Sequence, residues 1–346
     1  MRKRLVIKFA TQQDNYIYAL SDGIPVIFVI DRVSDVIVDC FVCPEEANIE
    51  GEVFSGLLVY ENSLILVPQN AKDVWIFHLV DKKWHKVDIS KYINRDSRNK
   101  FRGGCIKSGI LYMFGYSYRG IIAIDINDNK MWELAQNKTN LGGLLGLSIV
   151  ELNDKVYLPV RSMNGIICID TRSSMLEIRK TDVHSEIAND GLAYDGRHYY
   201  LLKNSGNELI VLNEEFSLEY RLKLDAFFNS KINYFEGIVY FSGKLILFGS
   251  NKYGYIYDLQ NENESYVINE SLYYAKALTG SELLVCKKGK IEIWNTNLEV
   301  IKEYVLEINE TDIVKVLGQF RLKEQMIYEN DLFGVEDLLR SVCCDF

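Results

Sequence analysis

Short apolar runs separated by polar loops follow one another along most of this chain. The clearest stretch, residues 111–135, reads as an apolar strand, a polar loop, a second strand that ends in Asp125, and a third strand. Similar units begin near residues 64, 156, 199, 245 and 283, so the pattern repeats about every 44 residues. A repeat of this length built from strands is typical of β-propeller blades, because one small sheet cannot bury both faces without stacking on its neighbours.

One strand of each unit ends in a polar residue, and these residues give seven alignment points. They are Asp31, His78, Asp125, Asp170, Asn213, Asp258 and Asn295, at intervals of 37 to 47 residues. An Asp or Asn at this point can begin the turn into the outer strand by bonding the backbone downstream of it. The short last interval fits a tight turn at residues 287–290. We therefore expect an all-β, seven-bladed β-propeller over residues 1–308.

The outer strands carry an aromatic residue at a similar place, and packing between neighbouring blades is its expected role. These residues are Trp84, Trp132, Tyr220, Tyr266 and Tyr304, while Val38 and Ile178 depart from the pattern.

Residues 309–346 no longer follow the blade period. Apolar residues from Leu332 to Val342 recur at helical spacing, which predicts a short helical C-terminal tail that docks on its own propeller or on a partner chain.

Glycines mark the third unit in particular. It carries Gly103, Gly104, Gly115, Asp125 and Trp132, and the sixth unit keeps Gly249 and Asp258. This arrangement resembles the kelch repeat, in which a Gly-rich inner strand leads to a strand ending in Gly, then a strand ending in Asp, and then a Trp. The resemblance covers residues 5–308 in outline, although most units lack the double glycine. It implies the fold of a protein-interaction module or, less often, of an enzyme, and it leaves the activity open.

Composition narrows the function classes. The net charge of −9 argues against general nucleic-acid binding, which needs a surplus of Lys and Arg to neutralise phosphates. Lys8 interrupts an N-terminal apolar stretch that is too short for a signal peptide or a membrane span, so we expect a cytoplasmic protein without membrane association. The odd number of cysteines, seven, fits reduced thiols.

The chain carries no strong catalytic or cofactor motif. Cys40 and Cys43 form a CxxC without a second pair of ligands for zinc, and no nucleophile elbow, P-loop or dinucleotide fingerprint is present. We therefore expect neither a metal nor a cofactor. Catalysis, if present, would depend on scattered loop residues.

Propeller geometry predicts where a ligand would bind. Loops that join second to third strands, or one blade to the next, share one face around the central channel. The residues expected to bind a ligand there are Arg102, Tyr116, Arg119, Arg161, Asn164, Lys203, Asn207, Lys252 and Tyr253. The segment 91–102 adds Lys91, Arg95, Arg98 and Lys100 to this face. The turns 31–35, 127–129, 213–215 and 260–264 of the opposite face are together acidic.

Clustered Arg and Lys beside Tyr and Asn suggest a surface for anions, because guanidinium groups pair bidentately with carboxylates and phosphates. We expect a non-catalytic binding or scaffolding propeller that presents this cationic face to a partner protein or to an anionic small molecule such as a sugar acid. Alternatively, the charged loops serve solubility alone. A further alternative is a carbohydrate-active or lyase-type enzyme at the channel mouth, with Asp190 or Glu236 as acid or base.

Overall fold

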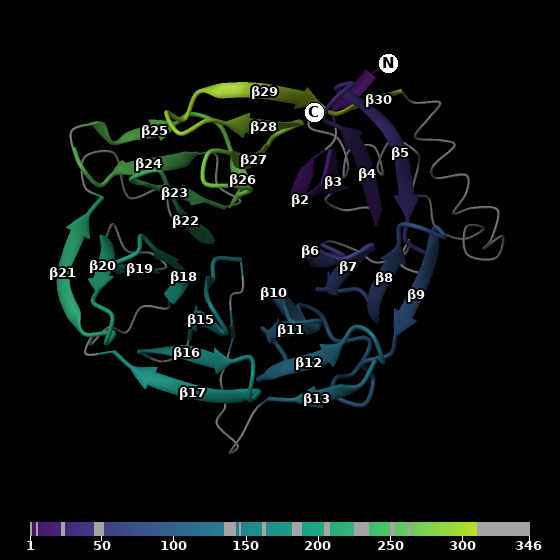
Figure 1. Cartoon of the computed structure of the whole chain (residues 1–346), viewed down its shortest axis with the longest axis horizontal. Helices are drawn as coiled ribbons and strands as arrows, with labels where there is room; N and C mark the ends of the chain where they lie inside the picture. Colours follow the sequence, from purple (N-terminus) through teal and green to yellow (C-terminus); the bar gives the residue numbers. More distant parts are fainter. Residues whose placement is uncertain are drawn as a thin grey trace.

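The computed structural model describes residues 2–4, 6–21, 25–44, 52–134, 143–144, 147–160, 164–181, 189–203, 208–224, 235–249, 253–261 and 264–309. These residues form seven four-stranded antiparallel sheets around a central axis, so the all-β, seven-bladed propeller is confirmed (Figure 1). Apart from Asn309, the expected helical tail lies outside the described residues.

Each blade is built from four consecutive strands. Blade 1 contains β2 (Ile7–Gln13), β3 (Tyr16–Ser21), β4 (Val26–Asp31) and β5 (Val36–Val42). Blade 2 contains β6 (Phe54–Tyr60), β7 (Ser63–Pro68), β8 (Val74–His78) and β9 (Lys83–Val87). Blade 3 contains β10 (Phe101–Lys107), β11 (Ile110–Gly115), β12 (Ile121–Asp125) and β13 (Met131–Glu133). Blade 4 contains β14 (Val150–Leu152), β15 (Lys155–Pro159), β16 (Gly165–Asp170) and β17 (Met175–Lys180).

The remaining strands complete the ring and join the chain ends. Blade 5 contains β18 (Asn189–Tyr194), β19 (Tyr199–Lys203), β20 (Glu208–Leu212) and β21 (Leu218–Lys223). Blade 6 contains β22 (Gly237–Phe241), β23 (Lys244–Phe248), β24 (Gly254–Asp258) and β25 (Tyr266–Ile268). Blade 7 contains β26 (Leu272–Ala277), β27 (Leu283–Lys287), β28 (Lys290–Trp294) and β29 (Val300–Val305). β1 (Arg2–Arg4) and β30 (Glu307–Asn309) form a separate two-stranded sheet.

The core consists of apolar clusters that lie between neighbouring blades. In β12, Ile121 and Ala123 pack towards blade 4, while Ile122 and Ile124 pack towards blade 2, because successive side chains of a strand point to opposite faces. A middle strand is therefore apolar along its whole length, whereas an outer strand has an exposed side. Stacking of this kind explains why the sequence shows continuous apolar runs at the middle strands.

The polar residues that align the blades begin the turns into the outer strands, as expected. A backbone N–H two residues downstream donates at 2.8 to 3.1 Å to the side chains of Asp31, Asp125, Asp170, Asn213, Asp258 and Asn295. His78 differs, since its Nδ1 lies 3.0 Å from Ser63 Oγ on the neighbouring strand. Imidazole lacks the short carbonyl-type acceptor that this turn uses.

The outer-strand aromatic residues divide into two groups. Trp84, Trp132 and Tyr304 pack against the clusters between blades, as expected. Tyr220 and Tyr266 are each 44% exposed, so the expectation is wrong for them. Tyr220 lies edge-on to His198 of its own blade, with ring centres 6.3 Å apart.

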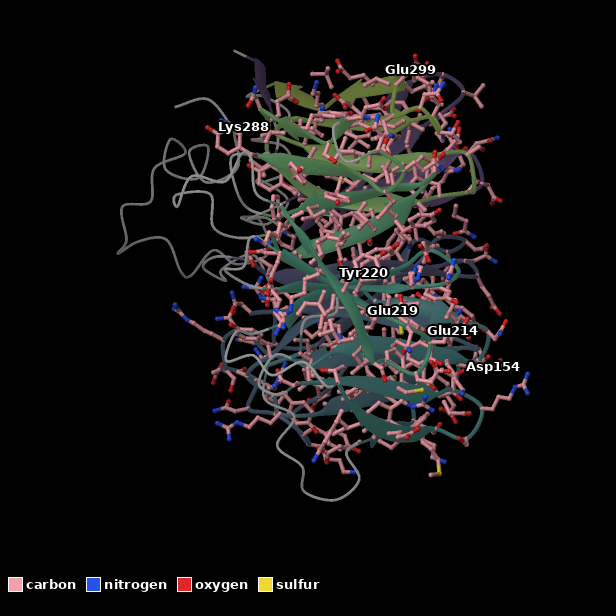
Figure 2. The ribbon with its side chains drawn as sticks, turned by 90° about the vertical axis from the view of Figure 1, so that its left-hand side faces the viewer. Asp154, Glu214, Glu219, Tyr220, Lys288 and Glu299 are labelled. Carbon is pink, nitrogen blue, oxygen red and sulfur yellow. The ribbon has the colours of Figure 1, made fainter. Side chains whose placement is uncertain are left out.

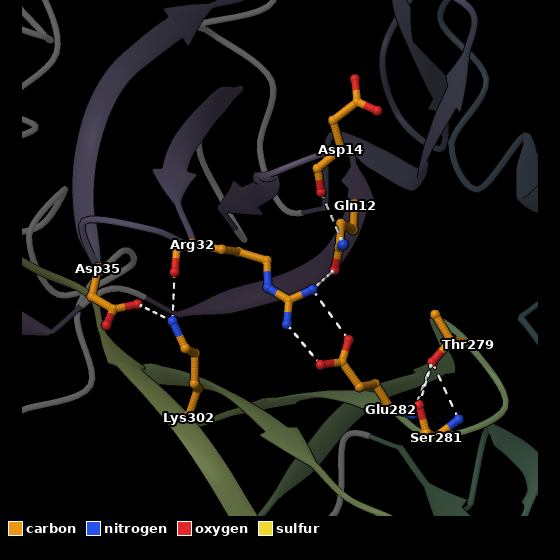
Figure 3. Close-up of polar contacts among 8 residues, drawn as sticks. All are labelled: Gln12, Asp14, Arg32, Asp35, Thr279, Ser281, Glu282 and Lys302. Atoms are coloured by element: carbon orange, nitrogen blue, oxygen red, sulfur yellow. Dashed lines mark hydrogen bonds and ion pairs between the residues drawn. The ribbon is translucent and has the colours of Figure 1, made fainter.

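The ring closes without exchange of a strand between the chain ends. β1 pairs antiparallel with β30, and Lys3 lies opposite Ile308. At the other end of the seam between blades 1 and 7, Arg32 donates to both carboxylate oxygens of Glu282, at 2.9 and 3.1 Å, and to Gln12 Oε1 at 2.7 Å (Figure 3). Lys302 Nζ also donates to Asp35 Oδ1 at 2.8 Å (Figure 3). We call these contacts the seam latch.

The two faces of the ring differ in their connections. We call the face with the second-to-third-strand loops and the blade-to-blade segments the loop face, and the face with the tight turns the turn face. Glu299, Glu214 and Asp154 mark the turn face and Lys288 marks the loop face, at opposite ends of the molecule in Figure 2. Among the described residues we find no helix with the length and apolar character that a bilayer crossing requires.

Candidate ligand site at the channel mouth

Inner strands carry a recurring β-bulge at their loop-face end. The pairing of the inner with the second strand shifts register after Ile7, Phe54, Phe101, Asn189 and Leu272. A polar residue stands immediately after each of these positions: Lys8, Ser55, Arg102, Asp190 and Tyr273. Bulges re-aim side chains and are frequent next to binding sites. The fold thus places these five residues at the loop-face ends of inner strands, around the end of the channel that we call the channel mouth.

Arg102 extends across this mouth. Its Nη1 lies 4.0 Å from Glu236 Oε2, although Arg102 belongs to blade 3 and Glu236 immediately precedes the inner strand of blade 6. The guanidinium also stacks over the Tyr116 ring, 5.4 Å from its centre. Its Nε is buried and has no hydrogen-bond partner within the described part of the chain. Because the separation of Nη1 from Glu236 is longer than a hydrogen bond, an anion that enters the mouth would meet the Nη donors.

A second carboxylate at the mouth is already paired. Glu52 forms an ion pair with Lys8 and accepts a hydrogen bond from Gln69 Nε2. Burial raises the pKa of the Glu52 carboxyl, but Lys8, Arg102 and Gln69 outweigh this effect, so its pKa lies below the usual range. Glu52 therefore stays ionised at neutral pH and stabilises the charges of Lys8 and Arg102. A carboxylate that holds no proton at neutral pH is a poor general acid, so its role is to position cations.

Several other cations of the loop face are engaged by the protein itself. Arg95 pairs with Asp73, which is buried, and the fully buried Lys100 donates to backbone carbonyls of residues 70 and 97. Lys287 contacts Glu292 at 2.8 Å. These three cations stabilise loops and strand ends, and they contribute less to an open anion surface than the charge count alone indicates.

Blade 5 contributes a buried acid and a buried base. Asp190 is 2% exposed, and Lys203, at the end of the neighbouring strand, is 3% exposed. Burial lowers the pKa of Lys203 to about 8, and the charge of Arg221 lowers it further than Glu208 raises it. The amine is therefore partly neutral at slightly alkaline pH.

Apolar side chains fill the axis beneath the mouth. Tyr274 lies edge-on to Phe9, with ring centres 5.5 Å apart, and to Phe248 at 5.8 Å. Leu147 of blade 4 and Tyr274 of blade 7 both pack against the cluster between blades 1 and 2. The Phe248 ring packs directly on the backbone of Gly237, where a Cβ would lie 2.2 Å from the ring. Only a glycine leaves room for the ring at this position. A ligand would thus meet a polar mouth with an apolar floor.

The sequence-predicted site residues are distributed as follows. Arg102, Tyr116 and Glu236 come together at the mouth, and Asp190 and Lys203 lie side by side in blade 5. Arg119 is exposed in the loop before β12, and Asn164 and Tyr253 precede β16 and β24. Arg161, Asn207 and Lys252 lie outside the described residues.

Sequence reasoning missed Lys8, Glu52, Gln69, Ser55 and Tyr273. A signal was present for those in the bulges, since Lys8, Ser55 and Arg102 are 47 residues apart and each interrupts an apolar strand. Aligning the units on their inner strands would have found them. Glu52 and Gln69 lie in loops outside that period, so only the fold brings them together.

Comparisons with known proteins agree on the fold and go no further. No protein-family description matches the chain, and no curated protein matches its sequence. Among solved structures, the chain is similar to the computationally designed Ika8 protein, with a TM-score of 0.58 and 8% sequence identity over 87% of each chain. Within the described residues, no group of three or more His, Cys, Asp or Glu side chains is arranged to hold a metal ion.

Proposed function

We propose that this protein is a non-catalytic binding propeller that receives an anionic group of a partner protein or small molecule at the channel mouth. The observation that carries this proposal is the geometry of Arg102. Its guanidinium is held by stacking on Tyr116, and its Nη1 stands 4.0 Å from Glu236 Oε2, which is longer than a hydrogen bond. An incoming carboxylate or phosphate could accept hydrogen bonds from the two Nη groups.

The kelch-like character and the cytoplasmic location belong to the same proposal. Gly103, which adopts φ 93°, supports the kelch resemblance, because the left-handed backbone explains a glycine at that place in the inner strand. Cys40, Cys43, Cys105, Cys168 and Cys286 are free thiols, which suits a reducing compartment.

Binding of small anions to the wild-type protein and to Arg102→Gln tests the proposal. Citrate, glucuronate, inorganic phosphate and a Glu-rich peptide serve as probes, and calorimetry and thermal shift as measurements. We expect at least one probe to bind the wild type and to bind Arg102→Gln about tenfold or more weakly, with weaker binding at high salt. Arg197→Gln, an exposed arginine of the turn face, is the matched control and should bind like the wild type. Equal affinity of the Arg102→Gln variant, or no binding of any probe, would contradict the proposal.

A catalytic function is the second candidate, favoured by the buried neighbours Asp190 and Lys203. An amine with a pKa of about 8 can exchange protons near neutral pH, and Glu236 lies at the same mouth. Turnover of uronic-acid oligosaccharides by the wild type, lost in Asp190→Asn and Lys203→Met, would favour a lyase-type enzyme over a binding protein.

A further inference from the structure

Four of the described charged groups at or beside the channel mouth balance one another. Lys8 and Glu52 form an ion pair. Asp190 and Lys203 belong to adjacent strands of blade 5 and are both almost completely buried. Each of these two sets contains one positive and one negative group, so neither gives the mouth a net charge. The charge that a ligand meets at the mouth therefore depends on the groups that remain.

Arg102 and Glu236 are those groups, and both are accessible to solvent. Their side chains are 21% and 25% exposed, and Arg102 Nη1 stands 4.0 Å from Glu236 Oε2, which is longer than a hydrogen bond. Arg102 lies in β10 and Glu236 immediately precedes β22, and these strands belong to opposite sides of the ring (Figure 1). We call these two residues the open pair, because they present one positive and one negative group to a ligand.

A ligand that carries both charges suits the open pair better than a simple anion. An anion beside Arg102 would also approach the carboxylate of Glu236, because 4.0 Å is well within the screening length of about 8 Å at physiological salt. A zwitterion avoids this repulsion. Its carboxylate can accept hydrogen bonds from the Nη groups of Arg102, while its cationic group donates to Glu236.

The charges of an α-amino acid have a suitable separation. Its N–Cα and Cα–C bonds of about 1.5 Å place the ammonium nitrogen about 2.5 Å from the carboxylate carbon. The oxygen atoms lie farther from the nitrogen than this carbon does, which brings the separation close to that of the open pair. An α-amino acid that lies alongside the open pair in the opposite sense thus has each charge next to its counterpart.

Apolar surface lies close to Glu236. Its backbone N–H donates to the carbonyl of Phe248 at 2.8 Å, and the Phe248 ring packs on Gly237. Tyr274 lies edge-on to this ring. Leu147 and Tyr274 are only partly buried, so they offer apolar surface to a ligand. An apolar side chain would gain from covering this surface, because apolar groups that leave water stabilise a complex.

We propose that the channel mouth binds a free α-amino acid with an apolar side chain, an assignment that rests on the proposed function and names the ligand of the same site. Arg102 binds the carboxylate, and Glu236 binds the ammonium group. The side chain of the ligand lies against Leu147 and Tyr274.

Calorimetry with leucine and three related compounds tests the proposal on the wild-type protein. N-acetylleucine keeps the carboxylate without the ammonium group, leucinamide keeps the ammonium group without the carboxylate, and glycine keeps both charges without the side chain. We expect leucine to bind at least about tenfold more tightly than each of the three. This comparison needs no substitution, so it does not depend on how a variant folds.

Glu236→Gln tests the recognition of the ammonium group. Because the amide carries no negative charge, we expect leucine to bind this variant about tenfold or more weakly, and N-acetylleucine to bind it at least as tightly as it binds the wild type. Glu215→Gln changes an exposed acid of the turn face and is the matched control. It should bind both compounds like the wild type.

The outcomes separate the ligand assignment from the proposed function. If N-acetylleucine binds as tightly as leucine and loses affinity in Arg102→Gln, the amino-acid assignment is overturned and an anion-binding propeller remains. Equal affinity for glycine and leucine, or unchanged affinity of Glu236→Gln for leucine, also overturns the assignment alone. If leucinamide binds as tightly as leucine, or if neither these four compounds nor citrate, glucuronate and phosphate bind, both proposals are contradicted.

Discussion

Lys203 shows how one buried side chain links stability to pH. It is 3% exposed, and burial lowers its pKa to about 8 from the ordinary 10.5. Between these values the unfolded chain binds the proton more strongly than the folded one. The free energy of unfolding should therefore rise as pH increases from about 8 towards 10.5, and the charged amine should weaken the fold at neutral pH.

Replacing this amine with an apolar side chain should remove its contribution to the pH dependence of stability. In Lys203→Met the rise of the free energy of unfolding between about pH 8 and pH 10.5 should be smaller than in the wild type. Urea unfolding at pH 7 and above pH 9 measures this, and the exposed Lys130→Met is the control. A variant as stable as the wild type at pH 7, with the same pH dependence, would show that Lys203 is not destabilised by burial.

Residues differ in how far sequence alone predicts their roles. Asp125 and Asn213 act on backbone two positions away, so local chemistry is sufficient to assign their turns. Arg102 was expected at the mouth, but its partner Glu236 follows it by more than a hundred residues in sequence and reaches it across the channel. The sequence suggested that Lys100 lies on the cationic surface, but its side chain is fully buried and its amine donates to backbone carbonyls. The composition of a loop does not reveal the course of its backbone, so this burial could not be predicted.

At the scale of the element, the seam latch replaces the strand exchange that could have closed the ring. Arg32 and Glu282 are partly buried, with side chains 17% and 23% exposed, and their two hydrogen bonds join blade 1 to blade 7. The repeat of about 44 residues was sufficient to predict the blades. The seam latch could not be predicted, because Arg32 and Glu282 stand in turns whose polar composition is ordinary and are brought together only when the ring closes.

A double-mutant cycle should detect coupling through the latch. For Arg32→Ala and Glu282→Ala, measured by urea unfolding, we expect an interaction energy of about 1 to 3 kcal/mol. The control pair, Lys83 and Asp81, is 4.0 Å apart and 77% and 50% exposed, so its coupling should stay below about 0.5 kcal/mol. Equal coupling in the two pairs would mean that the latch does not stabilise the seam.

For the whole molecule, the small sheet of β1 and β30 is the second closure of the ring. Ile308 lies opposite Lys3 in it. Ile308→Pro removes a backbone donor and should lower the melting temperature, with a loss of about 1 to 3 kcal/mol, whereas Ile308→Val keeps the donor and should be nearly neutral. Calorimetry of the two variants measures the difference. Identical melting temperatures would show that this sheet does not contribute to closure.

The order of strands also bears on how the protein is made. Blades follow one another from the N-terminus, and the sheet of β1 and β30, which joins the two ends of the ring, can form only after the strands of all seven blades have been synthesised. Until then, the apolar residues of blade 1 that face blade 7, such as Ile7, Phe28 and Ile30, have no cover. A nascent propeller is thus an incomplete ring whose first blade exposes an apolar face. A chaperone that binds this face would protect the protein from aggregation during its synthesis.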